Sequence, residues 1–173
     1  MNEASQISAR ALEMRQAFDR SFAEPAVTTR PETEDFIEIR LGDDAYAMRM
    51  SEIDGLHADV TITPCPSPLP ELLGLAGFRG TLMPVYDLPS LIGYPPGKNR
   101  WMVTCGKGEV AFAFGVFEDH FRIDARAVAP PEEGTQRHVA GIASTGKRTV
   151  LVIDLKSISE ALRSRLPRQA NKE

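Results

Sequence analysis

The segment GIASTGKRT at residues 141–149 comes closer to a catalytic motif than any other segment. It nearly matches the phosphate-binding loop G-x-x-x-x-G-K-[ST]. That loop needs a hydroxyl directly after the lysine to hold magnesium, and a helix that begins at the phosphates. Here Arg148 follows Lys147, and the residues after it, TVLVIDL, favour a strand. We predict a β-hairpin turn over residues 144–148, and an NTP-binding enzyme using Gly141–Lys147 stays a remote alternative.

Other titratable side chains give weaker signals of chemistry. Glu118-Asp119-His120 contains possible metal ligands, but the three histidines have no ligand spacing, so we expect no metal site. Asp87 and Asp154 each follow an apolar strand and precede a short helical segment, which indicates helix capping rather than acid–base catalysis. Neither Cys65 nor Cys105 has a metal, redox or catalytic spacing, and we expect two free buried thiols. These patterns favour a binding protein without a cofactor over an enzyme.

The most constrained stretch of the chain is residues 74–88, GLAGFRGTLMPVYDL. Glycines at positions 74, 77 and 80 allow the backbone to bend or to be closely approached. One cation, Arg79, lies between them in otherwise uncharged surroundings. It is either a solvated residue of a hairpin or a residue kept for a partner. The residue pattern by itself leaves both alternatives open.

The composition is that of a soluble globular domain with an extension. The chain has 173 residues, of which 42% are hydrophobic and 25% are charged. The formal net charge of −4 argues against a nucleic-acid-binding barrel, because such a protein needs a basic surface. The sequence contains no run of about 18 apolar residues and no signal peptide, so we expect a cytoplasmic protein without a membrane span.

Short strands are predicted in the middle of the chain. In FIEIRL, residues 36–41, the apolar side chains alternate, with Ile37, Ile39 and Leu41 on one face. Gly42-Asp43-Asp44 is a turn signal, and AYAMRM after it reads as a second strand. The pattern predicts a hairpin with a three-residue loop.

The segment EVAFAFGVF, residues 109–117, reads as one further strand. Its large side chains share one face: Val110, Phe112, Phe114 and Val116. Its small residues share the other: Ala111, Ala113 and Gly115. Large residues fill a core, whereas small ones permit close approach of another layer. The whole chain shows nine or ten short strands without βαβ alternation, which favours small β-barrels or a sandwich.

Helical periodicity is confined to the ends of the chain. An amphipathic helix is predicted within residues 1–24, and its apolar face consists of Ile7, Ala11, Met14, Phe18 and Phe22. A polar linker follows at residues 25–35. An isolated helix of this length is marginal in water, so we expect it to dock on its own domain or on a further partner.

The C-terminal helix is predicted to begin with a capping box, Ser157-x-x-Glu160. Its expected core-facing residues are Ile158, Ala161, Leu162 and Leu166. Pro167 ends it, and residues 167–173 are expected to be a disordered tail. The main domain is accordingly predicted to span residues 36–166.

Several segments carry a resemblance to a known family. The hairpin FIEIRLGDDAYAMRM is similar to the first two strands of that family's domain. Residues 74–88 are similar to its signature, G-x-x-N-L-R-G-x-x-x-P-[VI]-x-D-L, with structural positions at Gly74, Gly80, Pro84 and Asp87. Near the end of the chain, the segment GIA at residues 141–143, the segment VLVIDL and the short helix after it are similar to the end of the family's domain. The chain resembles the CheW-like adaptor proteins of bacterial chemosensory arrays, as a divergent member with an N-terminal helical extension.

The resemblance implies a mainly β fold. Two SH3-like five-stranded β-barrels would surround a shared core, with a C-terminal helix and the N-terminal helical extension added. It also implies no catalysis and no cofactor. Family members couple a CheA-type histidine kinase, through its regulatory domain, to the signalling tip of methyl-accepting chemoreceptors, in cytoplasmic assemblies recruited to membrane-associated receptor arrays. The implied interface residues are Arg79, Phe78 and Gly77 in the signature, and Ile53, Asp54 and Leu56 in a second segment.

The chain departs from the family pattern at four positions. Gly77 replaces the usual asparagine, Phe78 the usual leucine, and Gly55 stands where glutamate is common. Gly115 falls about where an aspartate is expected. These changes leave the scaffold intact but point to a different set of partners. An adaptor of a divergent pathway, controlling pili, surface behaviour or development, is therefore the alternative to a flagellar one.

Overall fold

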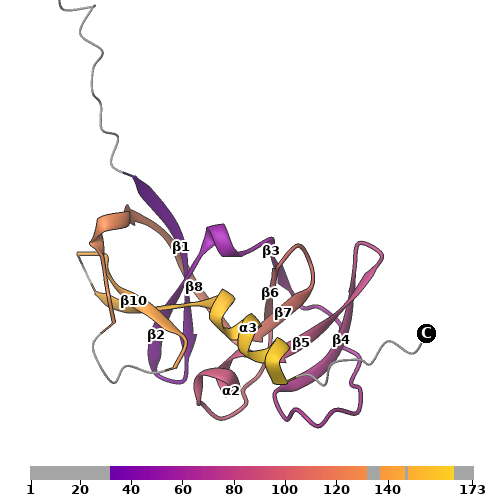
Figure 1. Ribbon diagram of the computed structural model, residues 1–173. Helices are drawn as coiled ribbons and strands as arrows, with labels where there is room; N and C mark the ends of the chain where they lie inside the picture. Colours follow the sequence, from indigo (N-terminus) through magenta and orange to yellow (C-terminus); the bar gives the residue numbers. More distant parts are fainter. Residues whose placement is uncertain (1–31, 132–136, 147, 166–173) are drawn as a thin grey trace, which may run out of the picture. The chain divides into compact units, whose positions relative to one another are not determined.

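Eleven strands form two sheets in the part of the chain that the computed structural model describes, residues 32–131, 137–146 and 148–165 (Figure 1). The strand order is β8-β1-β2-β11-β10-β9 in one sheet and β3-β6-β7-β5-β4 in the other. The predicted N-terminal helix and the predicted C-terminal tail lie outside the described residues. The fold class predicted from the sequence, two SH3-like barrels with a C-terminal helix, is confirmed for the remainder.

Barrel 1, the six-stranded sheet, is built from two separate stretches of chain. Its strands are β1 (Thr33–Leu41), β2 (Asp44–Arg49), β8 (Val116–Asp124), β9 (Val128–Ala129), β10 (Val139–Ser144) and β11 (Thr149–Ile153). A 3-10 turn, η2 (Ala125–Ala127), links β8 to β9. Neighbouring strands are antiparallel except β2 and β11, which pair in parallel. The sheet thus has one strand more than predicted, the two-residue β9.

Barrel 2, the five-stranded sheet, comes from one continuous stretch. Its strands are β3 (Gly55–Ala58), β4 (Leu72–Phe78), β5 (Thr81–Asp87), β6 (Trp101–Cys105) and β7 (Val110–Phe114). Only β5 and β7 pair in parallel. The 3-10 turn η1 (Met50–Glu52) leads into this barrel, and the short helix α2 (Leu88–Ile92) follows β5.

The β1–β2 hairpin is tighter than the sequence indicates. Leu41 pairs directly with Asp44, so the loop has two residues rather than the predicted three. Gly42 in this loop has a φ of +61°, a value that glycine adopts without steric cost. Strand β1 also begins three residues before the predicted strand, at Thr33.

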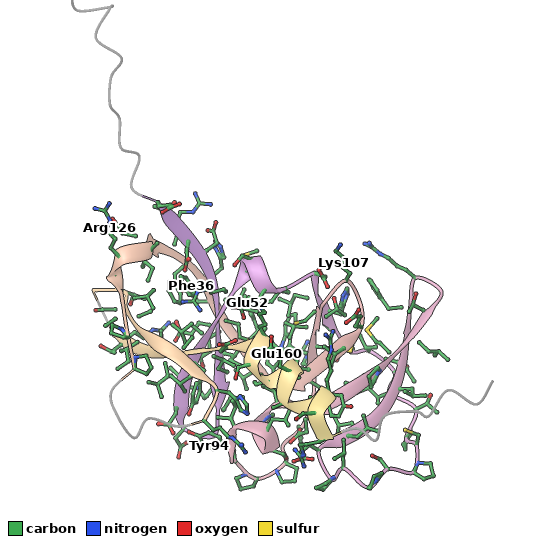
Figure 2. All side chains as sticks on the ribbon, viewed as in Figure 1. Phe36, Glu52, Tyr94, Lys107, Arg126 and Glu160 are labelled. Carbon is green, nitrogen blue, oxygen red and sulfur yellow. The ribbon has the colours of Figure 1, made fainter. Side chains whose placement is uncertain are left out.

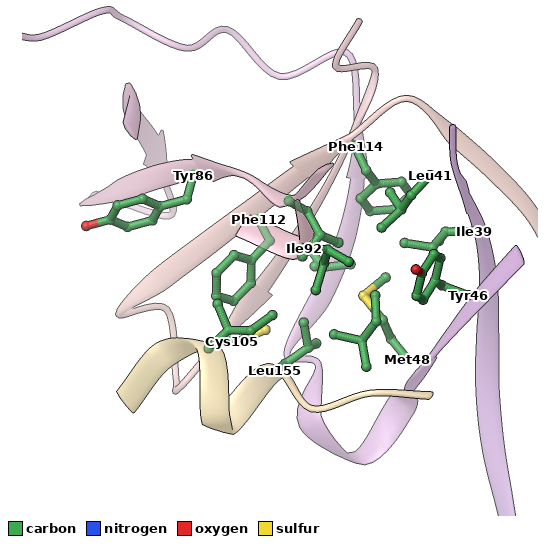
Figure 3. Close-up of a cluster of buried hydrophobic side chains, with 14 of the residues drawn as sticks. Ile39, Leu41, Tyr46, Met48, Tyr86, Ile92, Cys105, Phe112, Phe114 and Leu155 are labelled. Carbon is green, nitrogen blue, oxygen red and sulfur yellow. The ribbon is translucent and has the colours of Figure 1, made fainter. Parts of the chain in front are cut away.

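A shared apolar core joins the two barrels (Figure 3). Ile37, Ile39 and Leu41, the predicted inner face of β1, contribute to it from barrel 1. Phe112 and Phe114 contribute from barrel 2. Their sequence neighbours Ala111 and Ala113 point into the interior of barrel 2 instead, which confirms the large-and-small alternation predicted for this strand.

The predicted strand over residues 109–117 is wrong in one respect, because the chain changes sheets at Gly115. Strand β7 ends at Phe114 in barrel 2, and β8 begins at Val116 in barrel 1. A Cβ on Gly115 would lie 2.7 Å from the carbonyl oxygen of Lys98, so only glycine fits this crossing. After the crossing, the pattern of buried large side chains seen in β7 no longer continues. Val116, which that pattern places in the core, is 44% exposed.

Helix α3 (Leu155–Arg165) packs Leu155, Ile158 and Leu162 into the shared core and lies between the two sheets in Figure 1. The predicted capping box is wrong, since the helix starts before Ser157. The Asp154 side chain accepts a hydrogen bond from the Ser157 backbone N–H at 2.8 Å, as the capping prediction for Asp154 requires. Leu166, a predicted core-facing residue, lies outside the described residues.

The hairpin predicted in place of a phosphate-binding loop is confirmed. Ser144 pairs with Thr149, and strand β11 occupies the position where the nucleotide-binding motif needs a helix. Gly141 has a packing role, because a Cβ there would lie 2.6 Å from the Ala129 carbonyl oxygen on β9. Lys147 lies outside the described residues.

Both cysteines are free, as expected. Burial raises the pKa of the Cys105 thiol to about 12, with Asp54 and Glu52 adding to the shift, so this thiol stays protonated at neutral pH. The expectation of two buried thiols is wrong for Cys65, which is half-buried in the proline-rich loop before β4.

Candidate partner-binding surface

A pocket of about 340 Å³ in barrel 2 brings together the two sequence segments predicted to bind partners. Asp54 comes from the turn before β3, and Phe78 and Arg79 come from the end of the β4–β5 hairpin. The remaining lining residues are Thr81, Met83, Thr104, Lys107 and Gly108. We call this set, with its rim, the Arg79 surface.

Arg79 lies at the tip of a two-residue hairpin turn. Phe78 pairs with Thr81, and the two residues between them, Arg79 and Gly80, have φ values of +49° and +81°. Positive φ at both central positions is the geometry of a type I′ turn, which matches the twist of the flanking strands. This turn projects an exposed guanidinium. Arg79 forms no ion pair with any residue of the described ranges, and its guanidinium carbon lies 5.0 Å from the Phe78 ring centre.

Phe78 is held between Arg79 and His57. The His57 ring centre lies 4.2 Å from the Phe78 ring centre. A Cβ on Gly55 would lie 2.7 Å from the Nε2 of His57, so a side chain there would require the His57 ring to move. Two departures from the family pattern, Gly55 and Phe78, therefore meet at one histidine. Burial lowers the pKa of His57, and the nearby Arg79 guanidinium lowers it further.

Asp54 is exposed but fixed. Its backbone N–H donates to the Thr104 carbonyl at 2.7 Å, and its Oδ2 accepts from the Gly108 backbone N–H at 3.1 Å. The β6–β7 turn that carries Gly108 also carries Lys107, which forms no ion pair within the described ranges (Figure 2). The surface thus combines two cations without ion pairs, the Asp54 carboxylate and an apolar floor of Phe78 and Met83.

The other predicted interface residues lie around this pocket rather than in it. Ile53 and Leu56 are half-buried and pack against the shared core, so they position the strand more than they face solvent. Gly77 is exposed on β4, directly opposite Leu82 on β5. Sequence reasoning missed Leu82, which is 72% exposed. The alternation of β5 would have found it, since Met83 and Val85 point inward.

The four signature residues assigned to structure each have a local role. Gly74, with φ +148°, admits the Thr63 backbone, whose carbonyl oxygen would lie 2.1 Å from a Cβ there. Gly80 supplies positive φ to the hairpin turn. Pro84 lacks a backbone N–H, but it precedes the residues of β5 that pair with β7. It therefore removes no hydrogen bond between these two strands.

Asp87 caps α2, as predicted. Its Oδ2 accepts a hydrogen bond from the Ser90 backbone N–H at 3.1 Å, and its Oδ1 accepts from Asn99 Nδ2 at 3.0 Å. The carboxyl group is buried and fully used by these contacts, which leaves it no part in the Arg79 surface.

The family model of the CheW-like domain matches residues 35–163. The chain belongs to the CheW-like family. The crystal structure of the scaffolding protein TtCheW from Thermoanaerobacter tengcongensis superposes with a TM-score of 0.64 at 21% sequence identity. This superposition covers 69% of the present chain and 88% of TtCheW, and it shows that the CheW-like fold is shared. No curated protein matches the chain.

Within the described ranges, no helix of this CheW-like protein is long and apolar enough to cross a membrane.

Proposed function

We propose that this protein is a non-enzymatic adaptor that couples a CheA-type histidine kinase to methyl-accepting chemoreceptors in a bacterial chemosensory array. Membership of the CheW-like family supports an adaptor role. The observation that carries the site assignment is Arg79, an exposed guanidinium without an ion pair in the described ranges, held on a rigid turn. Such a cation is available to a partner at little cost to the fold.

The chemistry of the Arg79 surface defines what it would bind. Arg79 and Lys107 favour a carboxylate on the partner, and Phe78 and Met83 favour an apolar side chain beside it. Strand β4 is an edge strand paired only with β5 along most of its length, so a partner strand can add to it. Exposed Leu82 extends the apolar area across the same hairpin.

Coupling requires that contacts on one barrel affect those on the other. The shared core supplies the physical link, because strands of both barrels and helix α3 pack into it. Helix α3 starts at barrel 1 and is tied to barrel 2 by Arg165, which donates to Glu71 at 3.0 Å. A partner that shifts either barrel therefore acts on the same packed cluster. Such an adaptor would work in the cytoplasm, at the membrane-associated receptor arrays.

A second candidate is an adaptor of a divergent pathway that controls pili, surface behaviour or development. The contact of His57 with both Gly55 and Phe78 favours it. A side chain at position 55 would displace the His57 ring that packs on Phe78, which links these two departures from the family pattern. A linked change at the candidate interface indicates partners that differ from those of most family members.

The experiment is a binding measurement with the purified regulatory domain of a candidate CheA-type kinase and with a receptor tip, using Arg79→Glu. We expect affinity for at least one partner to fall about tenfold or more, because the charge that faces the partner is reversed. Unfolding free energy should change by less than about 1 kcal/mol, the size of the lost contact with Phe78.

Arg126→Glu is the matched control. Arg126 is an exposed arginine of η2 in barrel 1, away from Lys107 and the Arg79 surface in Figure 2. It should leave both affinities unchanged. Unfolding of the Arg79→Glu variant would show that Arg79 is structural, and unchanged binding to both partners would remove Arg79 from the interface.

A further inference from the structure

A second pocket lies at one end of barrel 1, whereas the Arg79 surface lies on barrel 2. It encloses about 450 Å³, a size common for small ligand sites. Its lining residues are Glu38, Asp119, Phe121, Thr145 and Arg148. None of them belongs to the family signature or to the predicted interface.

Glu38 is the unusual member of this pocket. It points into barrel 1 from β1 and is only 1% exposed, although buried glutamates are rare unless fully paired. One carboxylate oxygen, Oε2, lies 2.7 Å from Nη2 of Arg148. The other oxygen, Oε1, is buried and has no hydrogen-bond partner among the described residues. A buried acceptor left without a donor costs free energy that a ligand can recover.

The charges around Glu38 do not balance. Asp119 on β8 is its direct cross-strand partner, and like charges in that position destabilise a sheet. Glu118, which the bulge in β8 sets out of register, is shared by Arg40 at 2.6 Å and Arg148 at 3.8 Å. Three carboxylates thus face two guanidinium groups within the described residues.

The electrostatics of Glu38 follow from this arrangement. Burial raises the pKa of its carboxyl group, and the charges of Glu118 and Asp119 raise it further against the opposing effect of Arg148. An additional cation beside Oε1 would relieve both the missing hydrogen bond and the repulsion between carboxylates.

The surroundings favour an organic cation over a metal ion. No group of three His, Cys, Asp or Glu side chains in the described ranges has the arrangement of a metal site. The Arg148 guanidinium already lies on one edge of the Glu38 carboxylate, which disfavours a bare divalent ion there. Phe121 adds an aromatic wall, against which the methylene stem of a basic side chain can pack while its charged end reaches the carboxylates.

We propose that this end of barrel 1 binds a lysine or arginine side chain of a partner protein, whose cationic group donates to Glu38 Oε1 and to Asp119. Because Oε1 is buried, the partner side chain can reach it only after a side-chain movement. Arg148 is the group we expect to move, since its side chain is 46% exposed and lies 3.8 Å from a second carboxylate, Glu118. The site recognises a positive charge, whereas the Arg79 surface recognises a negative one. It does not depend on the proposed adaptor function.

The test is an NMR titration of the full-length, 15N-labelled protein with N-acetyl-argininamide and N-acetyl-lysinamide. Neutral N-acetyl-citrullinamide, which has the shape of the arginine analogue without its charge, is the control ligand. At least one cationic analogue should shift the backbone signals of Asp119, Phe121 and Thr145 saturably, and the citrulline analogue should not. Glu38→Gln should weaken this binding about tenfold or more, as expected for a hydrogen bond to a charged group.

Two further variants complete the design. Asp119→Asn should weaken binding less than Glu38→Gln does. It also tests the pocket if the Glu38→Gln variant does not fold. Glu160→Gln, which changes an exposed carboxylate of α3, should leave binding unchanged. Equal shifts with the citrulline analogue, or full binding by both pocket variants, would overturn the proposal. So would a response to Ca²⁺ at these residues together with none to either cationic analogue, because that would identify a metal site.

Discussion

The two barrels differ in where they place charges that lack a full set of partners among the described residues. The interior of barrel 2 contains apolar or small residues, namely Ala76, Met83, Val85, Met102, Ala111 and Ala113. Its unpaired cations, Arg79 and Lys107, lie outside at the tips of two turns. Barrel 1 has an apolar cluster around Phe36 and Val152, but it also buries Glu38 beside Arg148.

This difference shows how one fold can present two kinds of surface. The buried carboxylate of barrel 2, Asp87, is satisfied by hydrogen bonds as the cap of α2. The unpaired charge of this barrel lies at a rigid hairpin instead, where a partner meets it without disturbing the core. A charged interior makes barrel 1 depend on pairing, because a buried carboxylate without a counter-charge is costly. Since both barrels pack on one shared core, their stabilities should nevertheless be linked.

The largest effect is expected from Phe112→Ala in the shared core. Phe112 is fully buried among residues of both barrels, so the variant should lose about 3–5 kcal/mol of unfolding free energy. Hydrogen exchange measured across a denaturant series reports on barrel 2 through the β6 and β7 amides and on barrel 1 through the β10 and β11 amides. Both sets of amides should show one common unfolding transition. Phe117→Ala, at a half-buried site, should lose less unfolding free energy than Phe112→Ala. Two separate midpoints would mean that the barrels unfold independently.

The next effect compares one glycine in each barrel. Gly74→Ala in barrel 2 adds a Cβ 2.1 Å from the Thr63 carbonyl oxygen at a φ of +148°, and we expect a loss of about 3 kcal/mol. Gly141→Ala in barrel 1 meets the Ala129 oxygen at 2.6 Å without strained φ, and should lose about 1–2 kcal/mol. Denaturant unfolding measures both. Gly97→Ala, with no atom within 4 Å of the new Cβ, is the control and should change little.

The smallest effect is a pH dependence of opposite sign in the two barrels. The pKa of Glu38 is raised in the folded protein, so wild type should lose stability relative to Glu38→Gln as pH rises above about 4.5. The pKa of His57 is lowered, so wild type should lose stability relative to His57→Gln as pH falls below about 6.5. Thermal unfolding from pH 4 to 8 measures both, and slopes of the same sign would contradict the assignment.

Most of the fold could be predicted because its signals are local. The alternation of Phe112 and Phe114 with Ala111 and Ala113 identified two different packing faces, and both exist. The glycines around Arg79 indicated that the backbone can bend there, but the sequence left a hairpin turn as one of two alternatives, and the structure shows that turn. The sheet change at Gly115 could not be predicted, because the constraint comes from the Lys98 carbonyl, which only the folded chain brings close.

The candidate site was only partly predictable for the same reason. The family resemblance marked Arg79 and Asp54 separately, and the structure places them in one pocket. His57 carried no signal, since its importance lies in its contact with Phe78 from another strand. Glu38 reads in the sequence as an ordinary polar residue of an alternating strand. Only the closure of barrel 1 by β10 and β11, which brings Arg148 to it, makes that carboxylate buried.

The interrupted chain path of barrel 1 sets an order of events during synthesis. Every strand of barrel 2 has left the ribosome before β8 does, so its ladders can form early. Strand β2 ends at Arg49 but must wait for its parallel partner β11, which begins at Thr149. Until then Phe112 and Phe114 lack the part of the shared core that α3 supplies. Strand β11 and helix α3 therefore complete barrel 1 and the shared core after the strands of barrel 2 have been made.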